Sequence, residues 1–260
     1  MAMSSQTLFT RDPREIPFLH DQLKKILGLA DSASRNVTTD DDDDFGFMAI
    51  QFLYKQMHHA ESILILVPRR DAGLIARTMI DGLYKLLWAH QIPKERACLW
   101  RSSSLIEDWR LIQGRLKLGI SVDELDVRRN EVALKQLGHL HKKPKATAPD
   151  PYNEYWQGKI RLSDMANAVG RELYDGPYSE LSDWEHWGVN GIGQSITREN
   201  NHIIVDSNSD RAAMVSLLAA CQCLLRTLEV SDIHLSLNIR DVIQTLWQKL
   251  QETLDSFYRV

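Results

Sequence analysis

Residues 71–91 read DAGLIARTMIDGLYKLLWAHQ and form the most strongly patterned stretch of the chain. Apolar residues cover most of the helix circumference, which predicts a central, largely buried helix. Arg77 and Asp81 stand four residues apart, one turn apart on one side, between Tyr84 and Leu74. Charges at the edge of a buried face must be paired or hydrogen-bonded. The stretch therefore predicts a polar centre that serves either as scaffold or as half of a site.

Helical periodicity recurs along most of the chain, and no alternating strand pattern is present, so we predict an all-α fold. The expected architecture is a multi-helix bundle of about seven to nine helices. Ser121 and Glu124 have the spacing of a capping box that opens one of them. The predicted helices span about 16–30, 45–66, 71–91, 94–117, 121–139, 163–173, 177–188, 210–230 and 238–257.

The remaining segments predict the domain organisation. Residues 1–13 look like a flexible tail, and residues 14–260 are expected to form a single helical domain. A long irregular loop is predicted near 140–160, and a second loop at 188–201. The HIIV segment, residues 202–205, reads either as one short strand or as an extended segment.

Composition narrows the class of protein. The 260 residues are 43% hydrophobic and 25% charged, with a formal net charge of -4, which argues against a general nucleic-acid or membrane-surface binder. Three cysteines are too few for a disulfide framework and indicate a reducing compartment. The start of the chain lacks an apolar signal region, and the longest apolar run, Ile63–Val67, is too short to span a bilayer. We expect a cytoplasmic location and no membrane partner.

A second polar helix is predicted at residues 177–188. Tyr178, Ser182 and His186 follow one another at intervals of four and so share one side of it. Histidine titrates near neutrality, and neighbouring hydroxyls and a carboxylate such as Glu185 would orient it as a general base. The same residues would equally satisfy buried donors in a packed core, and spacing alone favours that structural interpretation.

Two short signatures carry a resemblance to a family. The segment ARTMIDGLYKLLWA, residues 76–89, resembles the Ala-Arg-x-x-x-Glu/Asp helix of a family of bacterial helical domains of unknown function. The later Tyr178-x-x-x-Ser182-x-x-x-His186 is similar to its second signature, and the likeness covers roughly residues 40–230. Asp81 replaces the more usual Glu, and Trp187 separates the histidine from the small residue that usually follows it. The resemblance implies that Arg77, Asp81, Ser182 and His186 converge, but it implies no known activity.

A basic stretch with aromatic residues behind it offers a different kind of site. Its cationic residues precede Tyr152, Tyr155 and Trp156. Basic and aromatic side chains together grip single-stranded nucleic acid through phosphate contacts and base stacking. The negative total charge favours a merely solvated loop. The nucleic-acid candidates are Arg128, Arg129, Lys142, Lys143 and Lys145.

Two acidic or histidine-bearing segments are candidate metal sites by composition. The run Asp40–Asp44 lacks the alternating ligands and turn glycine of a calcium loop, so we read it as a solvated helix start. His58 and Glu61 reverse the order found in di-iron bundles, and no second copy exists. We therefore expect neither a metal nor another cofactor.

Three functions compete. An arginine and a histidine are the minimum for metal-free cleavage of a phosphodiester, so one hypothesis is a metal-independent ribonuclease-like effector of bacterial defence or stress response, acting on RNA. Helical ribonucleases of the HEPN group place both residues on one helix, four to six residues apart. Only Arg14 and His20 have that spacing here, across Pro17, which we regard as chance. The alternatives are a non-catalytic ligand-binding or homodimerisation module, with a dimer contact through the last helix, and a nucleic-acid adaptor.

Overall fold

The computed structural model describes residues 14–143, 150–185, 196–199, 202–205 and 208–258. The predicted tail, residues 1–13, lies outside these ranges. The all-α prediction is confirmed, because nine α-helices run through the described residues. They are α1 (Glu15–Ser34), α2 (Asp44–Leu66), α3 (Asp71–His90), α4 (Pro93–Lys117), α5 (Glu124–Leu137), α6 (Leu162–Val169), α7 (Ser179–Glu185), α9 (Asp210–Leu235) and α10 (Arg240–Tyr258).

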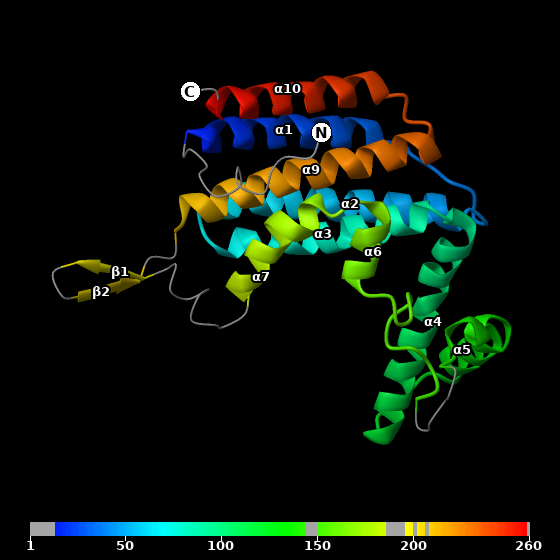
Figure 1. The fold of residues 1–260 in the computed structure, drawn as a ribbon. Helices are drawn as coiled ribbons and strands as arrows, with labels where there is room; N and C mark the ends of the chain where they lie inside the picture. Colours follow the sequence, from blue (N-terminus) through cyan, green and yellow to red (C-terminus); the bar gives the residue numbers. More distant parts are fainter. Residues whose placement is uncertain (1–13, 144–149, 186–195, 200–201, 206–207, 259–260) are drawn as a thin grey trace.

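The main bundle is built around α9. Helices α1, α2 and α3 pack against it, and α10 lies along α1 on the outer side (Figure 1). The apolar core runs through all five helices, from Leu23 of α1 to Leu250 of α10. Helix α3 is central, as predicted, but it shares that place with α9, whose alanines and cysteines allow close helix contact.

The length and apolar composition of α9 would suffice to cross a membrane. Core helices of soluble proteins meet the same criterion, and 83% of the relevant window of α9 is buried inside the bundle. Burial within the fold therefore accounts for its composition.

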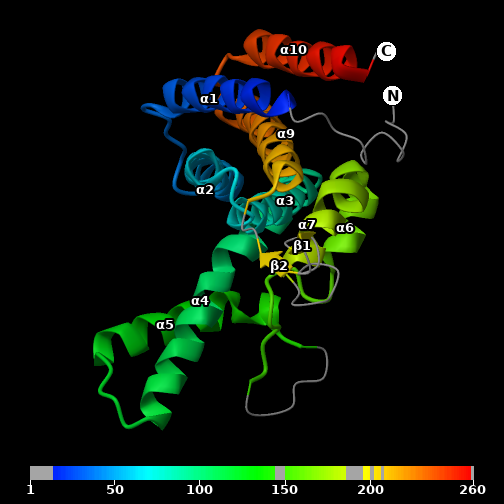
Figure 2. The ribbon, with the colours of Figure 1, turned by 90° about the vertical axis from the view of Figure 1, so that its left-hand side faces the viewer.

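Helices α4 and α5 form an arm. Helix α4 begins at Pro93 in its first turn and leaves the bundle at a steep angle, and α5 packs on it (Figures 1 and 2). Asn130 of α5 donates from Nδ2 to the Leu105 carbonyl at 2.9 Å. The buried His141, in the short 3₁₀ helix η2 (Gly138–His141), lies 2.8 Å through Nε2 from Ser102 Oγ. These polar contacts fix the base of the irregular segment that follows.

The structure corrects two local predictions. Helix α5 is capped by Asp123, whose carboxylate accepts from the Leu125 amide at 2.8 Å, and not by Ser121. Part of the predicted 188–201 loop is strand β1 (Ile196–Glu199), antiparallel to β2 (His202–Val205), with Ile196 opposite Val205. Strands of four residues are too short to show a convincing alternation in sequence. The two-stranded hairpin stands beside an otherwise helical fold (Figure 1).

Candidate functional site

Arg77 joins α3 to α7. Its Nε donates to Ser182 Oγ at 3.0 Å and its Nη2 to the Tyr178 hydroxyl at 3.2 Å. The guanidinium also lies over the Tyr178 ring, 5.0 Å from the centroid. Ser182 Oγ in turn donates to the Tyr178 carbonyl at 2.7 Å, one turn earlier. The structure therefore brings together three of the predicted site residues from positions about a hundred residues apart in the sequence.

A pair of tyrosines positions Tyr178. Tyr174 stacks on Tyr178, with ring centroids 5.1 Å apart and planes inclined by 14°. The Tyr174 amide donates to the Tyr84 hydroxyl at 3.0 Å, which ties the π-helical turn η3 (Tyr174–Tyr178) to α3. Burial raises the pKa of Tyr84 to about 12, so this hydroxyl stays neutral. The arrangement holds the start of α7 against the middle of α3.

The predicted general base, His186, lies outside the described residues. Helix α7 is described as far as Glu185, and Ser182 stands one turn before the histidine in the sequence. Asp81 is placed one turn along α3 from Arg77, and its ion pair is with Lys85, at 2.6 Å from Oδ2 to Nζ. Asp81 therefore belongs to a separate local pair, four residues further along the helix than the Arg77 contacts.

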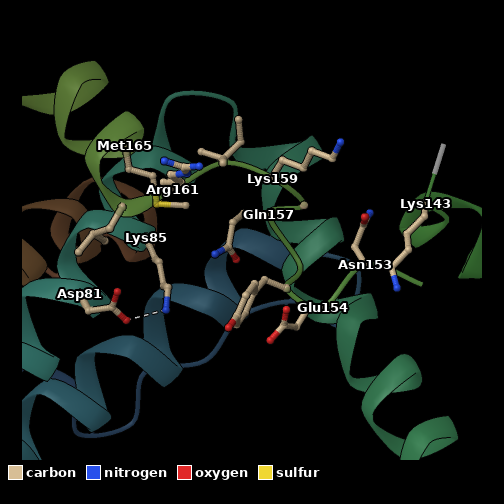
Figure 3. Close-up of a pocket in the computed structure, with 13 residues that line it drawn as sticks. Asp81, Lys85, Lys143, Asn153, Glu154, Gln157, Lys159, Arg161 and Met165 are labelled. Atoms are coloured by element: carbon tan, nitrogen blue, oxygen red, sulfur yellow. Dashed lines mark hydrogen bonds and ion pairs between the residues drawn. The ribbon is translucent and has the colours of Figure 1, made fainter. Parts of the chain in front are cut away.

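Two hollows open beside the Asp81–Lys85 pair, and both residues line both of them. The first, here called the basic hollow, has a volume of about 990 Å³ and lies between α3, the start of α6 and the 153–161 segment (Figure 3). Four basic and two acidic side chains surround it. They are Lys85, Lys143, Lys159 and Arg161, with Asp81 and Glu154.

The second, here called the aromatic hollow, has a volume of about 630 Å³ and lies between α2, α3, α4 and Trp156. Three buried side-chain atoms that line the hollows have no hydrogen-bond partner among the described residues: Gln56 Oε1 and His59 Nε2 in the aromatic one, and Gln157 Oε1 in the basic one. Burial lowers the pKa of His59, with a further lowering from Lys55. The aromatic side chains that line this second hollow are Phe52, Tyr54, Trp100 and Trp156.

The predicted nucleic-acid residues separate into different places. Arg128 and Arg129 are exposed on α5, where Arg128 lies 3.8 Å from Glu124. Lys142 is exposed, Lys143 lines the basic hollow, and Lys145 lies outside the described residues. Of the aromatic residues behind them, Tyr152 packs edge-on against Trp109 at 5.2 Å and Trp156 packs against Trp88 at 5.5 Å. Only Tyr155 of these three rings is largely exposed.

The acidic run and the last helix are also placed. Asp43 caps α2 by accepting from the Gly46 amide at 2.9 Å, and Arg101 pairs with Asp44 at 3.0 Å. Across the part of the chain that the structure describes, no group of three or more His, Cys, Asp or Glu side chains is arranged to hold a metal ion. On α10, Ile243, Leu250 and Leu254 are buried against the bundle, and Trp247 donates to Glu229 at 2.7 Å. Much of the apolar face of α10, through which a dimer contact was predicted, therefore packs within the chain. The side chains of Phe257 and Tyr258, at the end of this helix, lie outside the description.

A family model matches residues 46–203, from the third residue of α2 to the second residue of β2. The chain belongs to DUF5677, a family of unknown function. The expected resemblance to a family of helical domains without a known activity is thereby confirmed, over a somewhat shorter range than the predicted 40–230. Searches among curated proteins and among solved structures gave no match. The DUF5677 region contains the Arg77 contacts and all residues that line the two hollows.

Four polar residues that line the hollows were not among the predicted site residues: Gln56, His59, Lys85 and Gln157. Lys85 follows Asp81 by four residues, the same separation as that between Arg77 and Asp81, so the spacing allowed Asp81 to pair with either residue. Gln56, His59 and Gln157 carried no such signal, because they come from α2 and from an irregular segment about a hundred residues later.

Proposed function

We propose that this DUF5677 protein is a binding module for a small anionic ligand, which it takes up in the basic hollow. The observation that carries the proposal is the excess of basic side chains around a concave surface of about 990 Å³. That volume lies at the upper end of the range for small-molecule sites, about 300–1,000 Å³. The ion pair with Asp81 holds the Lys85 ammonium in place, with the side chain still 28% exposed. An anion would meet a preorganised cation and further donors from the 153–161 segment.

The geometry explains how the anion is received. Lys85 comes from a buried, rigid helix, and Lys143 is held by donating from Nζ to the Asp150 carbonyl at 3.2 Å. Among the described residues of the irregular segment, no carboxylate forms an ion pair with either lysine. Lysine ammonium groups act as point charges that suit phosphate-like oxygens, and attraction from several of them adds up within a concave site.

The test is a titration with inorganic pyrophosphate, with Lys85→Gln as the variant and Lys25→Gln as the matched control. Lys25 also pairs with an aspartate one turn earlier, Asp21, but on the exposed side of α1. We expect binding that weakens as salt is raised, an affinity loss of about tenfold in Lys85→Gln, equal to about 1.4 kcal/mol, and no loss in Lys25→Gln. Equal affinities in both variants, or no binding by wild type, would refute the proposal.

A second candidate function, the metal-independent ribonuclease-like effector of defence or stress response, is favoured by the Arg77 contacts. Arg77 is held against α7, the helix that leads to His186, by two hydroxyl groups. In that mechanism Arg77 stabilises the charge that develops on the phosphoryl group and His186 moves the proton. We rank it second because its base lies outside the described residues, whereas the lining of the basic hollow lies within them.

This candidate is tested by incubating the protein with total cellular RNA in the presence of a metal chelator. Wild type should cleave, and His186→Ala should be inactive at an unchanged melting temperature. His139→Ala, which removes an exposed histidine of η2, should cleave like wild type. Cleavage by His186→Ala at the wild-type rate would rule out this assignment of the base.

A further inference from the structure

We infer that the two hollows together form one nucleotide site, with the phosphates in the basic hollow and the base in the aromatic hollow. The inference rests on the proposed function, because it names the class of anion that the basic hollow takes. Each hollow alone is within or near the size range of small-molecule sites. Their chemistry differs in the way that the two ends of a nucleotide differ.

The two hollows are adjacent. Asp81 and Lys85 line both, so the ion pair stands on the boundary between them. On the opposite wall, Trp156 lines the aromatic hollow while its chain neighbour Gln157 lines the basic one. Figure 3 shows Gln157 and Lys85 pointing toward the same space between α3 and the 153–161 segment. A ligand that spans both hollows passes the Asp81 carboxylate, which accepts from hydroxyls such as those of a ribose.

The aromatic walls are held in place by the protein. Trp100 meets Phe52 edge-on at 5.6 Å, and Trp156 packs against Trp88 at 5.5 Å. These contacts fix the two indoles before any ligand arrives. Nucleobases bind to aromatic side chains by stacking, and this contact tolerates any base because each has a π face.

The unpaired polar atoms give the aromatic hollow a preference among bases. Gln56 is 2% exposed, and its Nε2 donates to the Met79 carbonyl at 2.8 Å. That carbonyl only accepts, so the amide orientation is fixed and Oε1 is the group left without a partner among the described residues. A buried acceptor of this kind is satisfied by an N–H donor, which an exocyclic amine supplies. His59, whose pKa burial lowers, offers Nε2 as a second hydrogen-bonding atom nearby.

Gly82 allows a clean test, because it lines the aromatic hollow on the outer side of α3. A Cβ placed there meets only Gln56 Nε2, at 3.4 Å, so a larger side chain extends into the hollow. Leucine is a better helix former than glycine, so Gly82→Leu should keep the fold while it fills the base site. The matched control is Gly114→Leu on α4, where a Cβ meets nothing within 4 Å.

The experiment titrates wild type, Gly82→Leu and Gly114→Leu with ATP, ITP and inorganic tripolyphosphate, and records the melting temperature of each protein. Wild type and Gly114→Leu should bind ATP at least tenfold more tightly than tripolyphosphate. Gly82→Leu should lose that advantage while it still binds tripolyphosphate. ITP, in which a carbonyl replaces the amine of adenine, should bind more weakly than ATP. A 5′-phosphorylated trinucleotide in the same series distinguishes free nucleotides from RNA ends as the source.

The outcomes separate the two proposals. If tripolyphosphate binds wild type as tightly as ATP does, the nucleotide inference is wrong and the anion-binding proposal stands. If neither ligand binds, both fail. Equal binding of ATP and ITP would overturn the role of Gln56. If Gly82→Leu melts at a lower temperature than wild type, Gly82→Ala is measured in its place, because it adds only one methyl group at that position. An unchanged ratio of ATP affinity to tripolyphosphate affinity in this folded variant would overturn the base site.

Discussion

Helices α9 and α3 share the centre of the bundle but differ in what they place at their edges. Helix α9 buries most of its length, and its buried polar groups are small: Ser216, Thr227 and Ser231. Helix α3 buries one side and carries Arg77, Asp81 and Lys85 along the other. The helix with the deepest burial therefore has no room for a ligand, and the candidate sites lie on its less buried neighbour.

The position of α3 explains the difference. It contacts α2 and α9 in the bundle, but also α4 of the arm and the smaller helices α6 and α7. Elements that meet at an angle leave hollows between them, whereas the nearly aligned helices around α9 fill their interface with alanine, leucine and cysteine (Figures 1 and 2). The basic and aromatic hollows both form against the exposed side of α3, where these smaller elements and the arm meet it.

The largest effect should come from the core of α9. Leu224 is 0% exposed, so Leu224→Ala removes buried methyl groups and leaves a cavity, at a cost of about 2–5 kcal/mol. The control, Leu74→Ala, makes the same change on α3, where the side chain is 42% exposed and the cost should stay near or below about 1 kcal/mol. Urea denaturation measures both. Similar losses of unfolding free energy in the two variants would contradict the expected difference between the buried α9 and the less buried α3.

An intermediate effect is expected at the Arg77 contacts between α3 and α7. Arg77→Ala removes two hydrogen bonds to Tyr178 and Ser182, and such a loss costs about 1–3 kcal/mol at a half-buried charged group. Ser182→Ala removes only one of them and should cost about 1 kcal/mol. Hydrogen exchange should report faster exchange in α7 than in α9 for both variants. Protection of α7 at the wild-type level in Arg77→Ala would show that other contacts hold the helix.

Sequence patterns predicted the long helices well, because a 3.6-residue period repeated over twenty or more residues is hard to mistake. They also predicted that Arg77 lies near Tyr178 and Ser182, through spacing within each helix and the family resemblance. The partner of Asp81 was not decided by spacing, since Arg77 and Lys85 are equally distant from it along the helix. In the structure, Arg77 binds the hydroxyl groups of Tyr178 and Ser182, and Asp81 pairs with Lys85.

The hollows were beyond prediction from one sequence. The aromatic hollow draws its walls from α2, α3, α4 and Trp156, so it exists only once the arm is placed on the bundle. A pattern within one segment cannot report the angle at which another segment meets it. The β1–β2 hairpin was missed for a simpler reason, because four residues per strand give too little alternation to recognise.

The smallest effect is a pH dependence where α3 and α9 meet. His90 Nδ1 lies 2.9 Å from His234 Nε2, and both rings contact Phe45. Burial lowers the pKa of both histidines; His90 lowers that of His234 further, and Asp43 opposes the shift. Because the unfolded chain takes up protons near pH 6.5 and the folded pair resists them, stability should fall as the pH drops from 7.5 through 6.5 toward 5.5.

The variant His90→Asn keeps a polar partner for His234 but removes one titrating ring, so its melting temperature should fall less steeply over that range. His58→Asn, which replaces an exposed histidine of α2, is the control and should follow the wild-type curve. If the melting temperature of His90→Asn depends on pH as that of wild type does, the pH dependence arises from other groups. The next residues to replace would be the half-buried His59 and the buried His141, because burial lowers their pKa values too. The polar contact between His90 of α3 and His234 of α9 would then contribute little to the pH dependence of stability.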